Sequence, residues 1–198
     1  MMIPCETLQK LNENHWVLVQ NFFTEKELQH LKAEALRRWQ KGEFQPAKVG
    51  RSQERQTAAE IRSDWISWMD LNLPEFDFFA QAVSQLQSDL NQNFYLGLQT
   101  FECHWARYAE GQFYKEHLDQ SPVKSRLHGE RVISFVLYLN ENWQNGDGGE
   151  LCLRHQPEEI RIQPRWGELV LFRSNTVPHA VLPSRTERWS LTGWFRRI

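Results

Sequence analysis

The sequence predicts an α+β chain that is mainly β: a double-sheet jelly roll flanked by N-terminal helices. Two helical patterns lie within the first 94 residues, and short alternating apolar runs dominate from about Tyr95 onward. Short strands of this kind bury one face each only when two sheets stack. The 198 residues, 40% of them hydrophobic, suffice for one compact domain over 1–198, with 1–94 as helical support and 95–198 as the roll.

Two helices are expected before the roll. The first follows the short strand-like run VLVQ, with Thr24 as N-cap, Glu27 completing a capping box and Gly42 ending the helix. Its expected apolar face comprises Leu28, Leu31, Ala35, Leu36 and Trp39. The second is expected from about Pro74 to Asn91, and its apolar face comprises Phe79, Val83, Leu86 and Leu90.

Residues 43–60 contain few large apolar groups and read as a loop. A plain solvated connection is one interpretation. The other is a substrate loop or lid that closes over a site, for which Gly50, Arg51 and Arg55 are the candidate residues.

The second half of the chain alternates between strand patterns and turn signals. The expected strands are FECHWARYA, RVISFVLYLNENW, GELCLRH, EIRIQP, ELVLFRS, HAVLP and RWSLTGWFRR, separated by turns such as NGDGG and QPRWG.

Composition excludes several classes of function. The 23 Lys and Arg residues against 25 Asp and Glu residues leave a net charge of -2, which argues against nucleic acid as a partner. Cys5, Cys103 and Cys152 have no C-x-x-C spacing and fit reduced thiols. The longest apolar run, VISFVLYL, is far shorter than the roughly 18 residues of a spanning helix. We therefore expect a soluble, cytoplasmic protein without a membrane partner.

The stretch GQFYKEHLDQ contains a His-x-Asp pair, His117 and Asp119, in a strand-like context. Residues two apart on a strand point to the same side, so an imidazole and a carboxylate can face one ion. The pattern alone is a weak signal, since chance supplies it in about one such chain in five.

A second histidine, His179, and an arginine, Arg188, strengthen the metal interpretation. Two histidines and one carboxylate form a facial triad that leaves three positions of an octahedral Fe(II) open, whereas zinc usually prefers four tetrahedral ligands. On the expected strand from Arg188, this arginine shares a face with Ser190, Thr192 and Trp194, and Glu187 points to the other side.

An arginine on an inward face needs an anionic partner, because an unpaired buried charge costs several kcal/mol. A dicarboxylic keto acid such as 2-oxoglutarate supplies that partner and fills two metal positions. Dioxygen takes the last position, and its reduction yields succinate, carbon dioxide and a hydroxylated substrate.

The segments YAEGQFYKEHLD, VLYLNENW, DGGEL, VPHAVLP and RWSLTGWF together resemble the Fe(II)- and 2-oxoglutarate-dependent prolyl hydroxylases, in particular bacterial relatives of the oxygen-sensing animal enzymes. The resemblance covers most of the chain and includes GEFQPAKVGR and EIRSDWISWMD, which are similar to the mobile loop and adjoining strand of that group. It implies a double-stranded β-helix fold.

The resemblance also assigns roles residue by residue. It makes His117, Asp119 and His179 the iron ligands, and Arg188 and Tyr138 the partners of the far carboxylate of 2-oxoglutarate. Tyr108 and Thr192 would line the cosubstrate pocket, Tyr114 and Trp194 the substrate pocket, and Asp64 with Arg131 would form an ion pair near its mouth. Dioxygen is the second cosubstrate, and the resemblance leaves room for ascorbate as a reductant.

The expected reaction is hydroxylation of a prolyl residue in a protein, for which the resemblance suggests elongation factor Tu. A small molecule or a free amino acid is the alternative substrate, and a jelly-roll binding module without turnover is the alternative class. Nucleic-acid demethylation fits less well, because oxygenases of that type carry a second arginine six residues after the first, where this chain has Trp194.

Overall fold

The computed structural model describes residues 3–48, 59–120, 129–155 and 158–198. Its helices are α1 (Cys5–Asn14), α2 (Glu25–Gln40) and α3 (Asp77–Phe94), and a 3-10 turn, η2 (Pro74–Phe76), leads into α3. Its strands are β1 (Trp16–Val19), β2 (Gln45–Pro46), β3 (Trp65–Trp68), β4 (Thr100–Tyr108), β5 (Tyr114–His117), β6 (Glu130–Tyr138), β7 (Leu151–His155), β8 (Glu158–Ile162), β9 (Leu169–Arg173), β10 (His179–Val181) and β11 (Arg188–Arg197). No helix in these ranges is long and apolar enough to cross a bilayer.

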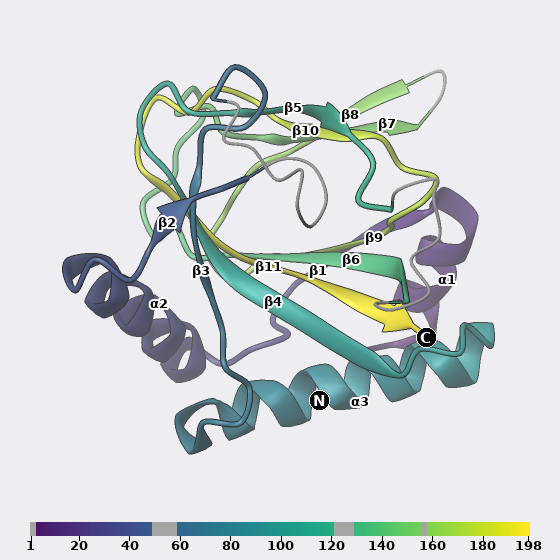
Figure 1. The fold of residues 1–198 in the computed structure, drawn as a ribbon. Coiled ribbons are helices and arrows are strands. Elements are labelled where there is room, and N and C mark those ends of the chain that lie inside the picture. The colour runs from purple at the N-terminus through teal and green to yellow at the C-terminus, as the bar shows by residue number, and fades with distance from the viewer. Residues whose placement is uncertain (1–2, 49–58, 121–128, 156–157) are drawn as a thin grey trace.

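The strands form two antiparallel sheets. The larger has the order β1-β9-β6-β11-β4-β3-β2, and the smaller has the order β5-β10-β7-β8. Figure 1 shows the smaller sheet over one face of the larger sheet, with α2 and α3 on the opposite side. This is the mainly β, double-sheet roll that the sequence predicted.

Each face of the larger sheet buries its own apolar cluster. On the helix side, Leu31 of α2 and Phe79 of α3 belong to one core with Leu191 and Phe195 of β11. Between the sheets, Val136 of β6 packs in a second core with residues of the smaller sheet. The site described below lies in the space between the sheets.

β11 alternates between these two environments, as predicted. Trp189, Leu191 and Phe195 face the helices, while Arg188 and Trp194 line the cavity between the sheets. Both sets are buried because both faces of this central strand are covered.

The two predicted helices are present. Thr24 caps α2 and forms the expected capping box with Glu27, and Gly42 follows the helix end at a φ of 71°. Leu36 is 38% exposed and lies at the margin of the buried stripe, so its predicted place on the apolar face was wrong. In α3, the predicted face of Phe79, Val83, Leu86 and Leu90 is buried.

The first 94 residues contribute more than helical support. They supply β1 and β3 to the larger sheet, and Gln45–Pro46 forms the short strand β2 against β3. Most of the predicted 43–60 loop, including Gly50, Arg51 and Arg55, lies outside the described residues.

Candidate active site

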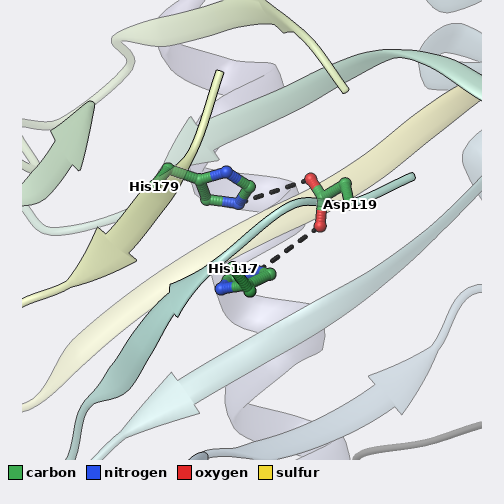
Figure 2. Close-up of side chains that lie close together, drawn as sticks. All are labelled: His117, Asp119 and His179. Atoms are coloured by element: carbon green, nitrogen blue, oxygen red, sulfur yellow. Dashed lines mark ion pairs between the residues drawn. The ribbon is translucent and has the colours of Figure 1, made fainter. Parts of the chain in front are cut away.

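Three side chains converge at one end of the smaller sheet. His117 ends β5, Asp119 lies two residues further on, and His179 begins β10. Because β10 pairs with β5 and places His179 opposite His117, the three side chains face one another (Figure 2). Nε2 of His117 lies 3.5 Å from Oδ1 of Asp119, and Nε2 of His179 lies 3.4 Å from Oδ2. One ligand atom from each residue lies within 4.8 Å of the other two, a spacing that fits a single ion.

Asp119 is positioned by a bend and not by a strand. β5 ends at His117, so the prediction that strand alternation aims both side chains was wrong. The main chain is held there by Gln120, whose N–H donates to the Ser174 carbonyl at 3.0 Å. The His-x-Asp spacing therefore works here through a bend that turns Asp119 back toward His179.

Main-chain carbonyls fix the tautomer of both histidines. Nδ1 of His117 lies 2.8 Å from the Lys115 carbonyl, and Nδ1 of His179 lies 3.1 Å from the Val177 carbonyl. A carbonyl oxygen only accepts, so each Nδ1 carries the hydrogen and each Nε2 presents its lone pair to the cluster. Ligand histidines are typically oriented in this way.

The ionisation of the cluster also suits a metal. Burial opposes ionisation of Asp119, but the adjacent His179 and His117 outweigh it and hold the pKa of this carboxyl well below its ordinary value. Burial lowers the pKa of His179 to about 4, although Asp119 opposes that shift. Near neutral pH the site therefore contains a carboxylate and an unprotonated imidazole, as metal binding requires. One oxygen and two nitrogen donors with further positions open fit Fe(II).

Arg188 lies in the same cavity without an anionic partner among the described residues. Its side chain is 2% exposed, and its guanidinium donates to the Gly149 carbonyl at 2.8 Å and to Ser190 Oγ at 3.2 Å. Glu187 points away and pairs with Arg107 on β4. An uncompensated buried guanidinium is costly, so this position fits the carboxylate of a ligand.

Two tyrosines frame that guanidinium. Its carbon lies 4.9 Å from the ring centroid of Tyr108 and 5.2 Å from that of Tyr138. The Tyr138 hydroxyl is buried and has no hydrogen-bond partner among the described residues. Burial raises the pKa of Tyr138 to about 12 and also raises the pKa of Tyr108, so both hydroxyls stay protonated. Tyr138 thus offers an unused donor beside an unpaired cation.

The metal cluster and the arginine open into one cavity of about 110 Å³ between the sheets. Arg188 and Tyr108 pair across β11 and β4 at one end, and Trp194 pairs with Ser134 toward the other end. Thr192 lies between these ends on β11 and also lines the cavity. The arrangement separates an anion-binding end from an aromatic end.

The two predicted substrate-pocket residues, Tyr114 and Trp194, have different neighbours. The Tyr114 ring stacks on His117, with centroids 3.6 Å apart, and Arg62 covers it at 4.6 Å. The guanidinium carbon of Arg131 lies 3.5 Å from the ring centroid of Trp194. Both aromatic side chains line the cavity.

The predicted ion pair between Asp64 and Arg131 does not form. Asp64 accepts two hydrogen bonds from Arg62, at 2.7 and 2.9 Å, because Arg62 lies only two residues away. Arg131 instead pairs with Glu102 on β4 at 2.8 Å. Both arginines therefore have a carboxylate partner, in contrast to Arg188, and Arg131 shares Glu102 with Arg196.

Three further residues of the site were not predicted from the sequence: His104, Ser134 and Gly149. His104 lines the cavity on β4, and Ser134 donates to Asp119 at 2.7 Å. Alternation on their strands would have found the first two, since His104 shares a face with Tyr108 and Ser134 shares one with Tyr138. Nothing in the pattern DGGEL indicates that the Gly149 carbonyl binds Arg188.

Comparison with known proteins agrees with this geometry. A family profile described as the 2OG-Fe(II) oxygenase superfamily matches residues 103–196, which include the triad and Arg188. The structure is similar to that of a Pseudomonas putida prolyl-4-hydroxylase, with a TM-score of 0.86 and 40% identity over 97% of this chain and 98% of the other. It is also similar to a Trichoplax adhaerens prolyl hydroxylase solved with a hypoxia inducible factor peptide, with a TM-score of 0.85 and 25% identity over 96% and 87% of the two chains.

Among curated sequences, the chain is 28% identical to a Caenorhabditis elegans hypoxia-inducible factor prolyl hydroxylase over 95% of its own length. It spans 27% of that longer relative, and 51% of a PKHD-type hydroxylase from Prochlorococcus marinus. Fe(II), 2-oxoglutarate and dioxygen are the cofactor and cosubstrates that the superfamily implies, and the His-Asp-His cluster and unpaired arginine fit the first two. The chain therefore belongs to the 2OG-Fe(II) oxygenase superfamily and, within it, to the prolyl hydroxylases.

Proposed function

We propose that this protein hydroxylates a prolyl residue of a protein substrate, consuming 2-oxoglutarate and dioxygen and releasing succinate and carbon dioxide. One observation carries the proposal: a buried arginine without an acidic partner among the described residues shares a cavity with a His-Asp-His cluster. That combination fits one ligand that is both a chelator and a dicarboxylate.

The His-Asp-His cluster, the arginine and one tyrosine each have a role in this proposal. His117, Asp119 and His179 hold the metal through two nitrogens and one oxygen. Arg188 binds the far carboxylate of 2-oxoglutarate, and the unpartnered Tyr138 hydroxyl donates to the same group. Bound Fe(II) lets dioxygen oxidise 2-oxoglutarate and place one oxygen atom in a C–H bond.

The aromatic end of the cavity would receive the prolyl ring. Trp194 and Tyr114 line the cavity with aromatic side chains that a saturated ring can contact, and Thr192 and Tyr108 also line it. Arg62 and Arg131 already have carboxylate partners in Asp64 and Glu102, so neither needs an acidic group on the substrate, and this end suits an uncharged residue.

The substrate class rests on the relatives, two of which are named as acting on hypoxia-inducible factor or were solved with a peptide from it. The resemblance of the sequence makes elongation factor Tu the first candidate for this chain. That substrate requires a cytoplasmic enzyme, and the free thiols of Cys103 and Cys152 fit a reducing compartment.

The decisive experiment is mass spectrometry of elongation factor Tu from the same organism after incubation with the protein, Fe(II), 2-oxoglutarate and air. We expect one added oxygen on a single proline, and none with Asp119→Ala, because that variant lacks one ligand and its charge. If succinate forms but elongation factor Tu gains no oxygen, the oxygenase assignment stands and another substrate, such as a small molecule or free amino acid, is favoured. Undiminished succinate formation by Asp119→Ala would remove the metal assignment.

A further inference from the structure

Two buried serines, Ser134 and Ser174, form a chain of hydrogen bonds that leads to the carboxylate of Asp119. Ser134 Oγ on β6 lies 2.7 Å from Asp119 Oδ2, and Ser174 Oγ lies 2.8 Å from Ser134 Oγ. Both serines have an exposed fraction of 0%. The pair belongs to the larger sheet and the turn after β9, whereas Asp119 follows a strand of the smaller sheet.

The direction of these hydrogen bonds follows from the chemistry of the groups. Ser134 Oγ is the donor to Asp119 Oδ2, since a carboxylate ligand has only acceptor oxygens. Ser134 therefore donates its single hydroxyl hydrogen to Asp119. The contact between the serines then has Ser174 as the donor and Ser134 as the acceptor.

Asp119 depends on this relay more than a strand residue would. β5 ends at His117, so Asp119 lies beyond the strand pairing that holds His117 opposite His179. Its Oδ1 faces His117 and its Oδ2 faces His179, so a rotation of the carboxylate would disturb both spacings at once. Ser134, a neutral donor, gives a hydrogen bond to Oδ2, and this bond restricts that rotation.

Ser174 also ties together the segments that carry the ligands. Its carbonyl accepts from Gln120, next to Asp119, and its own N–H donates to the Val132 carbonyl of β6 at 3.0 Å. The turn it begins continues to Val177, whose carbonyl orients His179. These main-chain hydrogen bonds remain in Ser174→Ala, which removes only the hydroxyl that donates to Ser134.

We propose that Ser134, supported by Ser174, is a positioning residue that orients Asp119 for metal binding and thereby sets the metal affinity of the site. Burying two hydroxyl groups costs free energy unless both form hydrogen bonds. Here the chain of hydrogen bonds from Ser174 through Ser134 leads to Asp119, the one anionic ligand. The inference rests on the proposed metal site and extends it beyond the three ligands. Hydrogen-bond partners of metal ligands typically change affinity by about 10- to 100-fold when removed.

The test is the dissociation constant of Co(II), measured by calorimetry and by its visible absorption, in metal-stripped protein without substrate. We expect Ser134→Ala to bind Co(II) about 10- to 100-fold more weakly, and Ser134→Thr, which keeps the hydroxyl, to stay near wild type. Ser174→Ala should fall between them, because Ser134 remains but loses its donor. Ser67→Ala is the matched control, since Ser67 is a buried serine on β3 of the same sheet and should leave the affinity unchanged.

Separate outcomes overturn separate claims. If wild-type protein binds Co(II) but folded Ser134→Ala binds equally well, the relay has no positioning role. If Ser134→Ala does not fold, Ser174→Ala decides, and wild-type affinity in that variant rejects the relay. If the wild-type protein does not bind Co(II), the metal site itself fails and the relay with it. Equal losses in Ser134→Thr and Ser134→Ala would show that packing, and not the hydroxyl, matters.

Discussion

Gly149 lies directly against Arg188: its carbonyl accepts the guanidinium hydrogen bond at 2.8 Å, and a Cβ built on it would come 2.9 Å from Cδ of that arginine. The same Cβ would lie 2.9 Å from Ser184 Oγ. Gly149 also has a φ of 72°, which residues with side chains rarely adopt. The glycine thus provides both an acceptor for Arg188 and the space that its side chain occupies.

Gly149→Ala should displace Arg188 and weaken 2-oxoglutarate binding while Co(II) affinity stays unchanged. Gly146→Ala is the matched control, because Gly146 also has a positive φ, 99°, but a Cβ there meets nothing within 4 Å. Both variants incur backbone strain, and only the first reaches the arginine. A cosubstrate titration of the two variants makes the comparison, and equal KM values for 2-oxoglutarate would contradict the expectation.

Arg188→Lys should raise the KM for 2-oxoglutarate by roughly a hundredfold. A lysine cannot donate to Gly149 and Ser190 and still present a fork to a carboxylate, and truncating one partner of a buried charge pair costs about 2 to 5 kcal/mol. Arg107→Lys is the control, because Arg107 already pairs with Glu187 on the helix side of the sheet. If both variants show wild-type KM values in a succinate assay, Arg188 does not bind the cosubstrate.

The two-sheet fold could be read from the sequence because its strands obey a simple alternation. The run RWSLTGWF sorts into helix-facing and cavity-facing residues by position alone, and β11 follows that rule from Arg188 to Phe195. Helix α1 carries a weaker signal, since its first turn lacks a side-chain cap and its main buried positions are Leu8 and Leu11. It was not predicted.

The site was less predictable wherever it depends on tertiary neighbours. The spacing of His117 and Asp119 indicated a metal, but the bend that aims Asp119 is held by Ser174, which is 55 residues further along the chain (174 − 119 = 55). The partner of Asp64 is, by contrast, a local one: Arg62, two residues away, takes the place that the family resemblance assigned to Arg131. The alternation of side chains along a strand predicts which face of the sheet a residue lies on, but it does not predict the hydrogen-bond partner of that residue.

Tyr138→Phe should have opposite effects on the free and the cosubstrate-bound protein. Removing a buried hydroxyl that has no partner among the described residues should raise the free energy of unfolding of the free protein by about 1 kcal/mol. The wild-type hydroxyl loses its hydration on folding and gains no hydrogen bond in return. Losing a donor to a carboxylate should raise the KM for 2-oxoglutarate about tenfold or more. Thermal melts without ligand and a cosubstrate titration measure the two effects. A variant that is less stable when free would mean that the hydroxyl already has a partner.

His104→Gln should make the metal-free protein less sensitive to acid. Burial, followed by the charge of Arg62, lowers the pKa of His104 to about 3, although nearby Asp64 opposes the shift and Arg131 adds to it. Nδ1 of His104 donates to the Trp105 carbonyl, which keeps the neutral ring in place.

The sign follows from where protons bind. The unfolded chain protonates this histidine below about pH 6.5, whereas the folded protein does so only near pH 3, so folding stability falls as the pH drops between these values. From pH 6.5 to pH 4.5 this one group should cost roughly 2 to 3 kcal/mol. Urea unfolding at both pH values measures the free energy of unfolding, and the wild-type protein should lose that much more than His104→Gln. Equal losses in the two proteins would mean that His104 is protonated in the folded state, and its ring would then carry a charge into the aromatic end of the cavity.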